Sequence, residues 1–172
     1  MIHRSLAKVY APLPDRRVEV AKALEAQITD KDFWLRQATV RALVIWAGKE
    51  NVAGLVKALD SDDLNTRRGI VGIIAKYKDP VSAPALAKLL PSLAERGDAS
   101  AALKAIGPAA EKAVIPMLKH SDSWAAMEAC KILKEIGTAE SLAPLQAILD
   151  AKPNFMVGPA ATEALKAIQG RK

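Results

Sequence analysis

Hydrophobic and polar positions follow one another along the chain in a pattern that repeats about every 30 residues. Leucines that close an apolar run, each followed by a polar turn, recur at intervals of 29 to 31 residues. Within each run the apolar residues have the three- and four-residue spacing of one helix face. A period of this length is typical of helical repeat proteins. The closing leucines are Leu59, Leu89, Leu118 and Leu149.

Each unit is expected to contain two helices. A first helix leads into a short turn rich in Asp and Ser, whose side chains can cap the helix that follows. Gly48, Gly107 and Gly137 are expected to end second helices in the left-handed conformation. We therefore predict an all-α, right-handed α-α superhelix, a solenoid of about five helix pairs. An initial first helix is expected at 16–28 and second helices at 32–47, 63–77, 94–106, 123–136 and 158–169.

The composition agrees with this architecture. Hydrophobic residues make up 51% of the chain but aromatic residues only 4%, and alanine is abundant. A β-protein would use more β-branched and aromatic residues, whereas Ala and Leu suit closely packed helices. A length of 172 residues fits one domain. We predict a single domain, 1–172, with repeats at 16–47, 48–77, 78–106, 107–136 and 137–169.

Three segments of the sequence resemble the repeat of a known family. The first is Asp32-Phe33-Trp34-Leu35-Arg36 with the later Ala42-Leu43, the second runs from Asp62 to Arg67, and the third is Ile106-Gly107-Pro108. The pattern resembles HEAT repeats, in particular the short phycobilisome-lyase-like type. The resemblance implies that one arginine in each of the first three units bonds the Asp-rich turns and forms a structural ladder. It says little about function, because function depends on sites and not on the fold. The ladder residues would be Arg36, Arg67 and Arg96.

Candidate chemistry is sparse. The only histidines are His3 and His120, and the single cysteine, Cys130, lies in an alanine-rich stripe with no group placed to activate it. The sequence contains no His-x-x-x-His, Cys-x-x-Cys or Gly-x-Gly-x-x-Gly motif. It also lacks the His-Glu pairs that hold iron in the HEAT-like deoxyhypusine hydroxylases. We therefore expect no enzyme activity, no catalytic residue, no metal and no cofactor.

The second helices of such a solenoid line its concave face, which makes their outward positions the candidate binding surface. Two tryptophans share one of these positions, where they either anchor a partner or pack as core. Basic side chains on the same face suit a carboxylate-bearing peptide better than duplex DNA, which needs more phosphate contacts. The candidate partner-binding residues are Trp34, Gln37, Arg41, Arg68, Trp124 and Lys131.

The net charge of +6 is spread along the chain, which indicates solubility more than a nucleic-acid footprint. The favoured function is a non-catalytic protein–protein interaction module or scaffold whose partner is another protein or an acidic peptide. The alternative is a nucleic-acid-binding HEAT solenoid, at the extreme one similar to the HEAT-like DNA glycosylases. No apolar run is long enough to span a membrane. The single cysteine favours a cytoplasmic location, and no oligomeric state is indicated.

Overall fold

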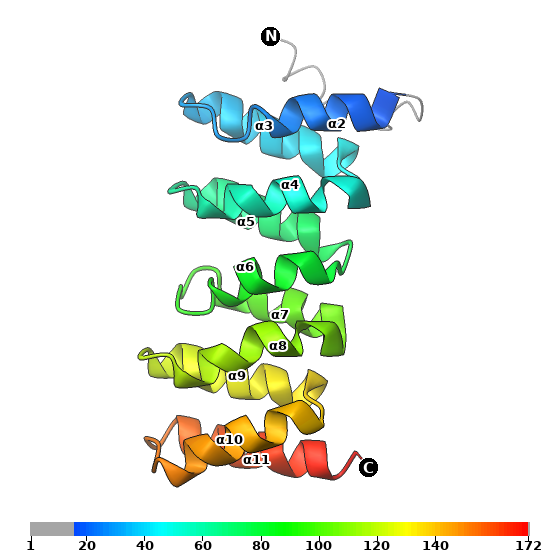
Figure 1. Ribbon diagram of the computed structural model, residues 1–172. Helices are drawn as coiled ribbons and strands as arrows, with labels where there is room; N and C mark the ends of the chain where they lie inside the picture. The colour runs from blue at the N-terminus through cyan, green and yellow to red at the C-terminus, as the bar shows by residue number, and fades with distance from the viewer. Residues whose placement is uncertain (1–15, 172) are drawn as a thin grey trace. The chain divides into compact units, whose positions relative to one another are not determined.

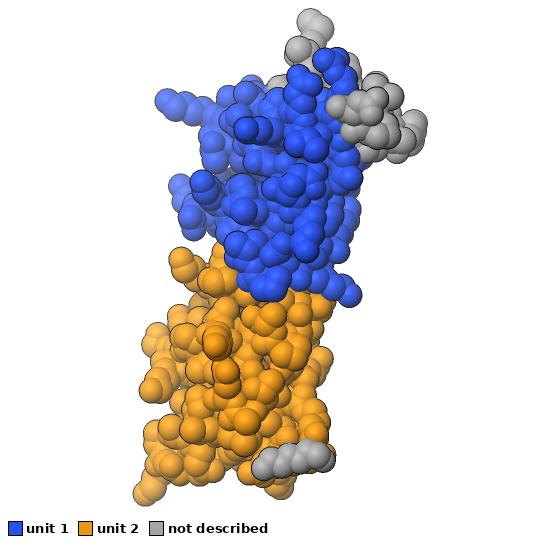
Figure 2. All heavy atoms as spheres, turned by 45° about the vertical axis from the view of Figure 1, so that its right-hand side comes forward, with its two compact units in different colours: residues 1–82 blue, residues 83–172 orange. Residues whose placement is uncertain are grey.

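Residues 16–171 are described by the structure, which is a computed structural model. They form helices joined by short turns, and no strand occurs among them. The chain divides into two compact units, residues 1–82 and 83–172, which Figure 2 colours separately. The predicted all-α class of helical repeats is confirmed. The expected single domain over 1–172 stays a prediction.

The described residues of unit 1 form two helix pairs, whose helices are labelled in Figure 1. The first pair is α2, Arg17–Glu25, and α3, Phe33–Trp46. The second pair is α4, Val52–Lys57, and α5, Leu64–Ala75, and α3 packs against both α2 and α5. The second helices therefore begin one residue later and end one or two residues earlier than predicted. Short 3-10 turns occupy Lys49–Asn51, Ala58–Asp60 and Pro80–Ser82.

Unit 2 contains three second helices, with α9 packed against both α7 and α11. The first helices of unit 2 are shorter than its second helices. Two of them follow 3-10 turns, at Gly107–Ala110 and Ala139–Ser141, and α8 is continued by a third, Ile115–Lys119. In chain order the helices are α6, Ala83–Ala87; α7, Arg96–Ile106; α8, Glu111–Val114; α9, Ser123–Ile136; α10, Leu142–Asp150; and α11, Val157–Gln169.

Prolines explain part of this difference in helix length. Pro116 lies in the 3-10 turn that replaces the second half of the first helix after Val114. A proline there removes a backbone donor and clashes with the preceding turn. Pro144 instead falls in the first turn of α10, where no intrahelical bond is needed, and that helix continues to Asp150. An interior proline therefore interrupts a first helix only beyond its first turn.

The predicted caps form at the Asp-rich turns. Asp32 accepts hydrogen bonds from the backbone N–H groups of Trp34 and Leu35 at 2.8 and 3.2 Å. Asp63 and Asp122 hold the equivalent places before α5 and α9. Each cap satisfies donors that the first turn of a helix leaves unpaired. Asn154, four residues before Gly158, does the same for α11 through Met156 N and Val157 N.

The glycine prediction is correct at one position only. Gly107 has φ of 82° and ends α7 in a left-handed conformation. Gly48 and Gly137 have φ of −121° and −65°, so their backbones are not left-handed. Gly137 is required for space instead, because a Cβ there would lie 2.5 Å from Leu133 O. Close packing, and not backbone handedness, selects this glycine.

The third repeat departs from its predicted boundaries. Its second helix begins at Arg96 and not at 94, because residues 88–95 form turns after the short α6. Ser92 takes the place of the capping aspartate, and its carbonyl accepts from Arg96 N at 2.8 Å. Asp98, in the first turn of α7, is exposed, so its carboxylate does not carry the cost of burial.

The core of each unit lies between first and second helices. The second helices contribute fully buried leucines one turn before their ends, Leu43 in α3 and Leu133 in α9. The first helices contribute Leu55 in unit 1 and Leu145 in unit 2, each also fully buried. Because the buried positions share one helix face, the opposite face of every second helix is left open to solvent.

Candidate interaction surface

The three ladder arginines bond the turn that precedes their own helix. Arg36 Nη1 donates to the carbonyls of Asp30 and Lys31 at 2.7 and 3.0 Å. Arg67 Nη1 donates to Ser61 O at 2.6 Å. Arg96 Nε donates to Leu90 O at 2.6 Å, and its Nη2 donates to Pro91 O at 2.9 Å. The same offset therefore recurs in the first three repeats.

Two of these arginines also lie near the aspartate that caps the next second helix of their own unit, α5 for Arg36 and α9 for Arg96. Arg36 Nε lies 3.6 Å from Asp63 Oδ2, and Arg96 Nη2 lies 3.9 Å from Asp122 Oδ2. The Thr66 hydroxyl is the largest influence that holds the pKa of Asp63 below its ordinary value. For Asp122 the lowered pKa comes first from the hydrogen bond of the Ala125 N–H. Both carboxylates are therefore charged at neutral pH.

Both candidate tryptophans lie on the surface. Trp34 is 68% exposed and Trp124 is 55% exposed, whereas the third tryptophan, Trp46, is only 3% exposed. Trp34 makes an edge contact with Phe33, their ring centroids 5.2 Å apart. The Arg96 guanidinium lies 5.9 Å from the centroid of the Trp124 ring. The alternative that both tryptophans pack as core is therefore excluded.

The polar candidates differ in how they are engaged. Gln37 is half-buried, and its Nε2 donates to Asp63 Oδ2 at 2.9 Å, so it ties α3 to the start of α5. Arg41 and Arg68 are exposed on α3 and α5. Lys131 is exposed on α9, with its ammonium 3.7 Å from a Glu128 carboxylate oxygen.

The structure brings the candidates together in two groups. Trp34, Gln37 and Arg41 follow one stripe of α3 in unit 1, and Arg68 lies on the adjacent α5. Trp124 and Lys131 lie seven residues apart on α9 in unit 2. These positions fall on one side of their helices because residues three, four and seven apart share a helix face.

A groove of about 450 Å³ runs along the same face in unit 2. Its lysines are paired: Lys104 with Glu135 at 2.5 Å and Lys134 with Glu163 at 2.9 Å. The hydrogen bond from Lys134 holds the pKa of Glu163 below its ordinary value. Sequence reasoning did not assign these pairs, although the spacing of about one repeat between the partners is the signal that would have found them. The lining residues are Lys104, Met127, Lys131, Lys134, Glu135, Met156, Pro159, Ala160 and Glu163.

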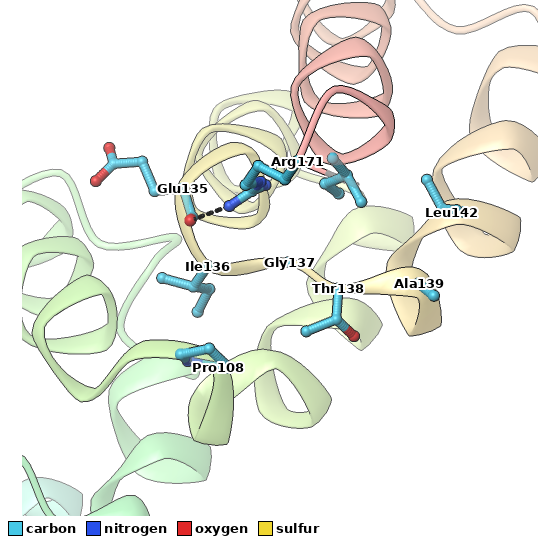
Figure 3. Close-up of a pocket in the computed structure, with 9 residues that line it drawn as sticks. Pro108, Glu135, Ile136, Gly137, Thr138, Ala139, Leu142 and Arg171 are labelled. Carbon is cyan, nitrogen blue, oxygen red and sulfur yellow. Dashed lines mark hydrogen bonds between the residues drawn. The ribbon is translucent and has the colours of Figure 1, made fainter.

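A second cavity of about 360 Å³ lies at the C-terminal ends of α9 and α11 (Figure 3). Ile136, Leu142 and Ile168 give it apolar walls. Arg171 lines it too, but its guanidinium donates to the carbonyls of Glu135 and, at 2.8 Å, Lys134. These donors neutralise the C-terminal end of α9. The cavity therefore has no polar group aimed at a ligand among its described residues.

Cys130 and His120, the side chains considered as candidates for chemistry, take part in the packing and hydrogen bonding of the fold. Burial raises the pKa of the Cys130 thiol to about 12, so this cysteine is not a nucleophile. His120 Nδ1 accepts from Asp122 N at 3.0 Å. No cluster of His, Cys, Asp or Glu suited to a metal ion occurs within residues 16–171, and His3 lies outside them.

Glu111 is buried but fully bonded within unit 2. Its carboxylate accepts from Thr138 N, Thr138 Oγ1 and Ser141 Oγ, at 2.7, 2.8 and 2.5 Å. Burial alone would raise the pKa of Glu111, but these hydrogen bonds offset that effect and hold the pKa below its ordinary value. Glu111 therefore fixes the turn between the fourth and fifth repeats.

Paired helices in tandem, with recurring caps and a recurring arginine, define an α-helical repeat protein. A family model for HEAT repeats matches residues 20–107 and again residues 91–166. The chain therefore belongs to the HEAT-repeat family, and the phycobilisome-lyase-like subtype stays a prediction. Proteins of this family generally act as non-catalytic scaffolds for protein–protein interaction. A search of curated proteins found no match. None of the described helices is both long and apolar enough to cross a membrane.

Proposed function

We propose that the chain is a non-catalytic interaction module that binds a segment of a partner protein on the open face of its second helices. The observation that carries this proposal is the exposure of Trp34 and Trp124 on that face, while Trp46 is buried. An exposed tryptophan leaves a large apolar surface in water, and tryptophan is enriched among the residues that dominate binding energy. The predicted cytoplasmic location belongs to the same proposal.

The surroundings of the tryptophans support binding and not catalysis. Met127 and Met156 line the groove of unit 2 beside paired lysines and glutamates. Methionine side chains adapt to different apolar partners, which suits a recognition surface. The polar groups there already bond one another, so none is poised to act on a substrate. The arrangement offers contact area and not reactive groups.

The test is to select ligands from a displayed library of random peptides against the full chain and to measure their affinities by fluorescence anisotropy. Trp34→Ala or Trp124→Ala should weaken a selected peptide by about 30-fold, the effect of losing an anchor worth about 2 kcal/mol. Val18→Ala is the matched control, because Val18 is 57% exposed but lies on the first helix α2.

Unchanged affinity in both tryptophan variants would overturn the proposal. Generic duplex DNA should be titrated in parallel at low salt. If DNA binds with a steep salt dependence and the tryptophan variants lose it, the nucleic-acid alternative replaces the protein-binding proposal.

A further inference from the structure

Two turns of unit 2 carry the most exposed large apolar side chains among residues 16–171. Leu93, in the turn before α7, is 86% exposed, and Phe155, in the turn before α11, is 87% exposed. Trp124, at the start of α9, is 55% exposed and lies between them in the sequence, 31 residues from each. Single exposed apolar residues are ordinary, but three that gather on one surface mark an interaction site.

Contacts between the turns bring these three residues onto one edge of unit 2. Asn154 Nδ2 donates to Ser123 Oγ at 2.7 Å, which ties the turn of Phe155 to the turn of Trp124. Arg96 donates to two carbonyls of the turn before its helix, and its guanidinium lies 5.9 Å from the centroid of the Trp124 ring. Figure 1 shows the three turns on the same side of unit 2. We call this surface the turn edge, and it consists of residues 88–96, 119–124 and 150–156.

Each turn of the turn edge also has an exposed lysine. Lys88 follows α6, Lys119 ends the 3-10 turn after α8, and Lys152 follows α10. None of the three forms an ion pair within residues 16–171. The groove lysines on the second helices of the same unit, in contrast, are paired with glutamates. The turn edge therefore combines large apolar side chains with cations that have no carboxylate beside them.

The acidic residues of the turn edge offset little of this positive charge. Glu95 is only 1% exposed. Asp122 accepts from two backbone N–H groups of α9 and lies 3.9 Å from the Arg96 guanidinium, so its charge is already balanced. Asp150 is exposed, and its Oδ1 accepts from Gln146 Nε2 at 2.8 Å. Three exposed lysines therefore face one exposed carboxylate on this edge.

The corresponding turns of unit 1, residues 29–34 and 60–64, have apolar side chains but the opposite charge. Phe33 and Trp34 are 40% and 68% exposed there. Lys31 is the only basic residue of these two turns, which contain five aspartates. An anionic surface would therefore be repelled by the turns of unit 1 and attracted by the turn edge of unit 2. The aspartates are Asp30, Asp32, Asp60, Asp62 and Asp63.

We propose that the turn edge of unit 2 binds the surface of an anionic lipid bilayer. Leu93, Trp124 and Phe155 enter the headgroup region, where aromatic rings are favoured, and the three lysines attract anionic headgroups. Such binding depends on buried apolar area and on charge, and it requires no membrane-spanning helix. A protein partner fits less well, because anchors between proteins usually fill well-packed pockets. A fluid headgroup layer instead accepts side chains that project from turns. This proposal goes beyond the proposed function and does not rest on it.

The test is to sediment the full chain with sucrose-loaded vesicles of phosphatidylcholine, with or without about one third phosphatidylserine. The wild-type chain should bind the anionic vesicles about tenfold or more tightly than the neutral ones. Leu93→Ser combined with Phe155→Ser should weaken this binding by about tenfold or more, because both apolar side chains are lost. Val44→Ser is the matched control, since Val44 is 49% exposed on the open face of α3. Its binding should stay within about twofold of wild type.

A second pair of variants tests the charge. Lys119→Gln combined with Lys152→Asn should weaken binding to the anionic vesicles by about 25-fold, about fivefold for each lysine. Asparagine is chosen at Lys152 because the backbone there has φ of 52°, which asparagine adopts readily. Lys112→Gln is the control, since the Lys112 side chain is 83% exposed but lies on the first helix α8. It should bind the anionic vesicles as wild type does.

The outcomes separate this proposal from the proposed function. If the chain binds both kinds of vesicle equally or neither, or if the variants at the turn edge bind anionic vesicles as wild type does, the bilayer proposal is wrong. The Leu93→Ser, Phe155→Ser chain should keep its affinity for a peptide selected on the open face. If it loses that peptide and wild type ignores vesicles, the turn edge is a protein interface. All the replaced side chains are exposed, so circular dichroism should show an unchanged fold.

Discussion

The open faces of the two units carry different sets of charged side chains, although the repeats that form them are alike. In unit 1 the second helices α3 and α5 carry arginines without any carboxylate. In unit 2 the lysines that line the groove, Lys104, Lys131 and Lys134, each lie within 4 Å of a glutamate. The charge of the groove lysines in unit 2 is therefore offset by glutamates of the same unit.

The framework beneath these faces is shared. Asp32 and Asp122 cap α3 and α9 with the same pattern of backbone hydrogen bonds. Arg36 and Arg96 bond turn carbonyls at the same sequence offset. The comparison of the units therefore indicates that buried and turn positions maintain the repeat, while the outward positions of the second helices are available for recognition.

The largest expected effect concerns the framework, where the two units should respond alike. Leu43→Ala in unit 1 and Leu133→Ala in unit 2 each truncate a fully buried side chain. Each should lower the free energy of unfolding by about 2–5 kcal/mol, measured by urea denaturation. Lys134→Ala, next to Leu133 but exposed, should cost less than about 1 kcal/mol. Equal losses at 133 and 134 would show that the buried face is misassigned.

A smaller loss of stability is expected when Glu111, a buried residue of unit 2, is replaced. Glu111→Ala leaves Thr138 and Ser141 without an acceptor and should cost about 1–3 kcal/mol at pH 7. The folded pKa of Glu111 is lowered from the 4.5 of the unfolded chain. Its contribution is therefore complete above pH 4.5 and is lost as the pH falls through the folded pKa. Denaturation curves of variant and wild type should converge in acid, and a constant gap would contradict this assignment.

The ladder arginine of α5 should matter more than the arginine beside it. Arg67→Ala removes the donor to Ser61 O and should cost about 1 kcal/mol or more. Arg68→Ala removes an exposed side chain and should lower the melting temperature less. If Arg68→Ala proves the more harmful change in thermal melts, the assigned register of α5 is shifted by one residue.

The smallest effect is expected when the glutamates paired with the groove lysines of unit 2 are neutralised. Glu128→Gln combined with Glu163→Gln leaves Lys131 and Lys134 without these carboxylates. Affinity for a selected peptide that carries Asp or Glu should rise by about threefold, because the lysines then add an attractive charge. Asp150→Asn, on the first helix α10, is the control and should leave that affinity unchanged. A loss of affinity would mean that the glutamates themselves contact the ligand.

Much of the fold could be predicted from the sequence. The recurring leucines and Asp-rich turns placed α3 and α9 within one or two residues, because helix periodicity and capping are local. The third repeat was harder to place, since the break before Arg96 follows from how residues 88–95 turn after a short α6. The stop at Gly137 reflects contact with Leu133 and Ile168, which no local pattern reveals.

The candidate surface was only partly predictable for a related reason. The outward positions of the second helices included Trp34 and Trp124. The sequence could not decide whether these residues anchor a partner or pack in the core, since aromatic rings suit both. Gln37 was expected on the open surface and is instead held by Asp63 of the next repeat. Pairing of Lys131 and Lys134 with glutamates depends on contacts within and between helices, so the neutral face of unit 2 emerged only from the structure.

The central claim is that a partner segment docks on the open face of the second helices with Trp34 as an anchor, and tryptophan fluorescence tests it most directly. In Trp124→Phe the exposed emitter is Trp34, in Trp34→Phe it is Trp124, and Trp46 is buried in both. Adding the selected peptide should shift the emission of Trp124→Phe to shorter wavelength and protect it from acrylamide quenching. The Trp34→Phe chain should show neither change. Protection of Trp124 with no change at Trp34 would contradict the account.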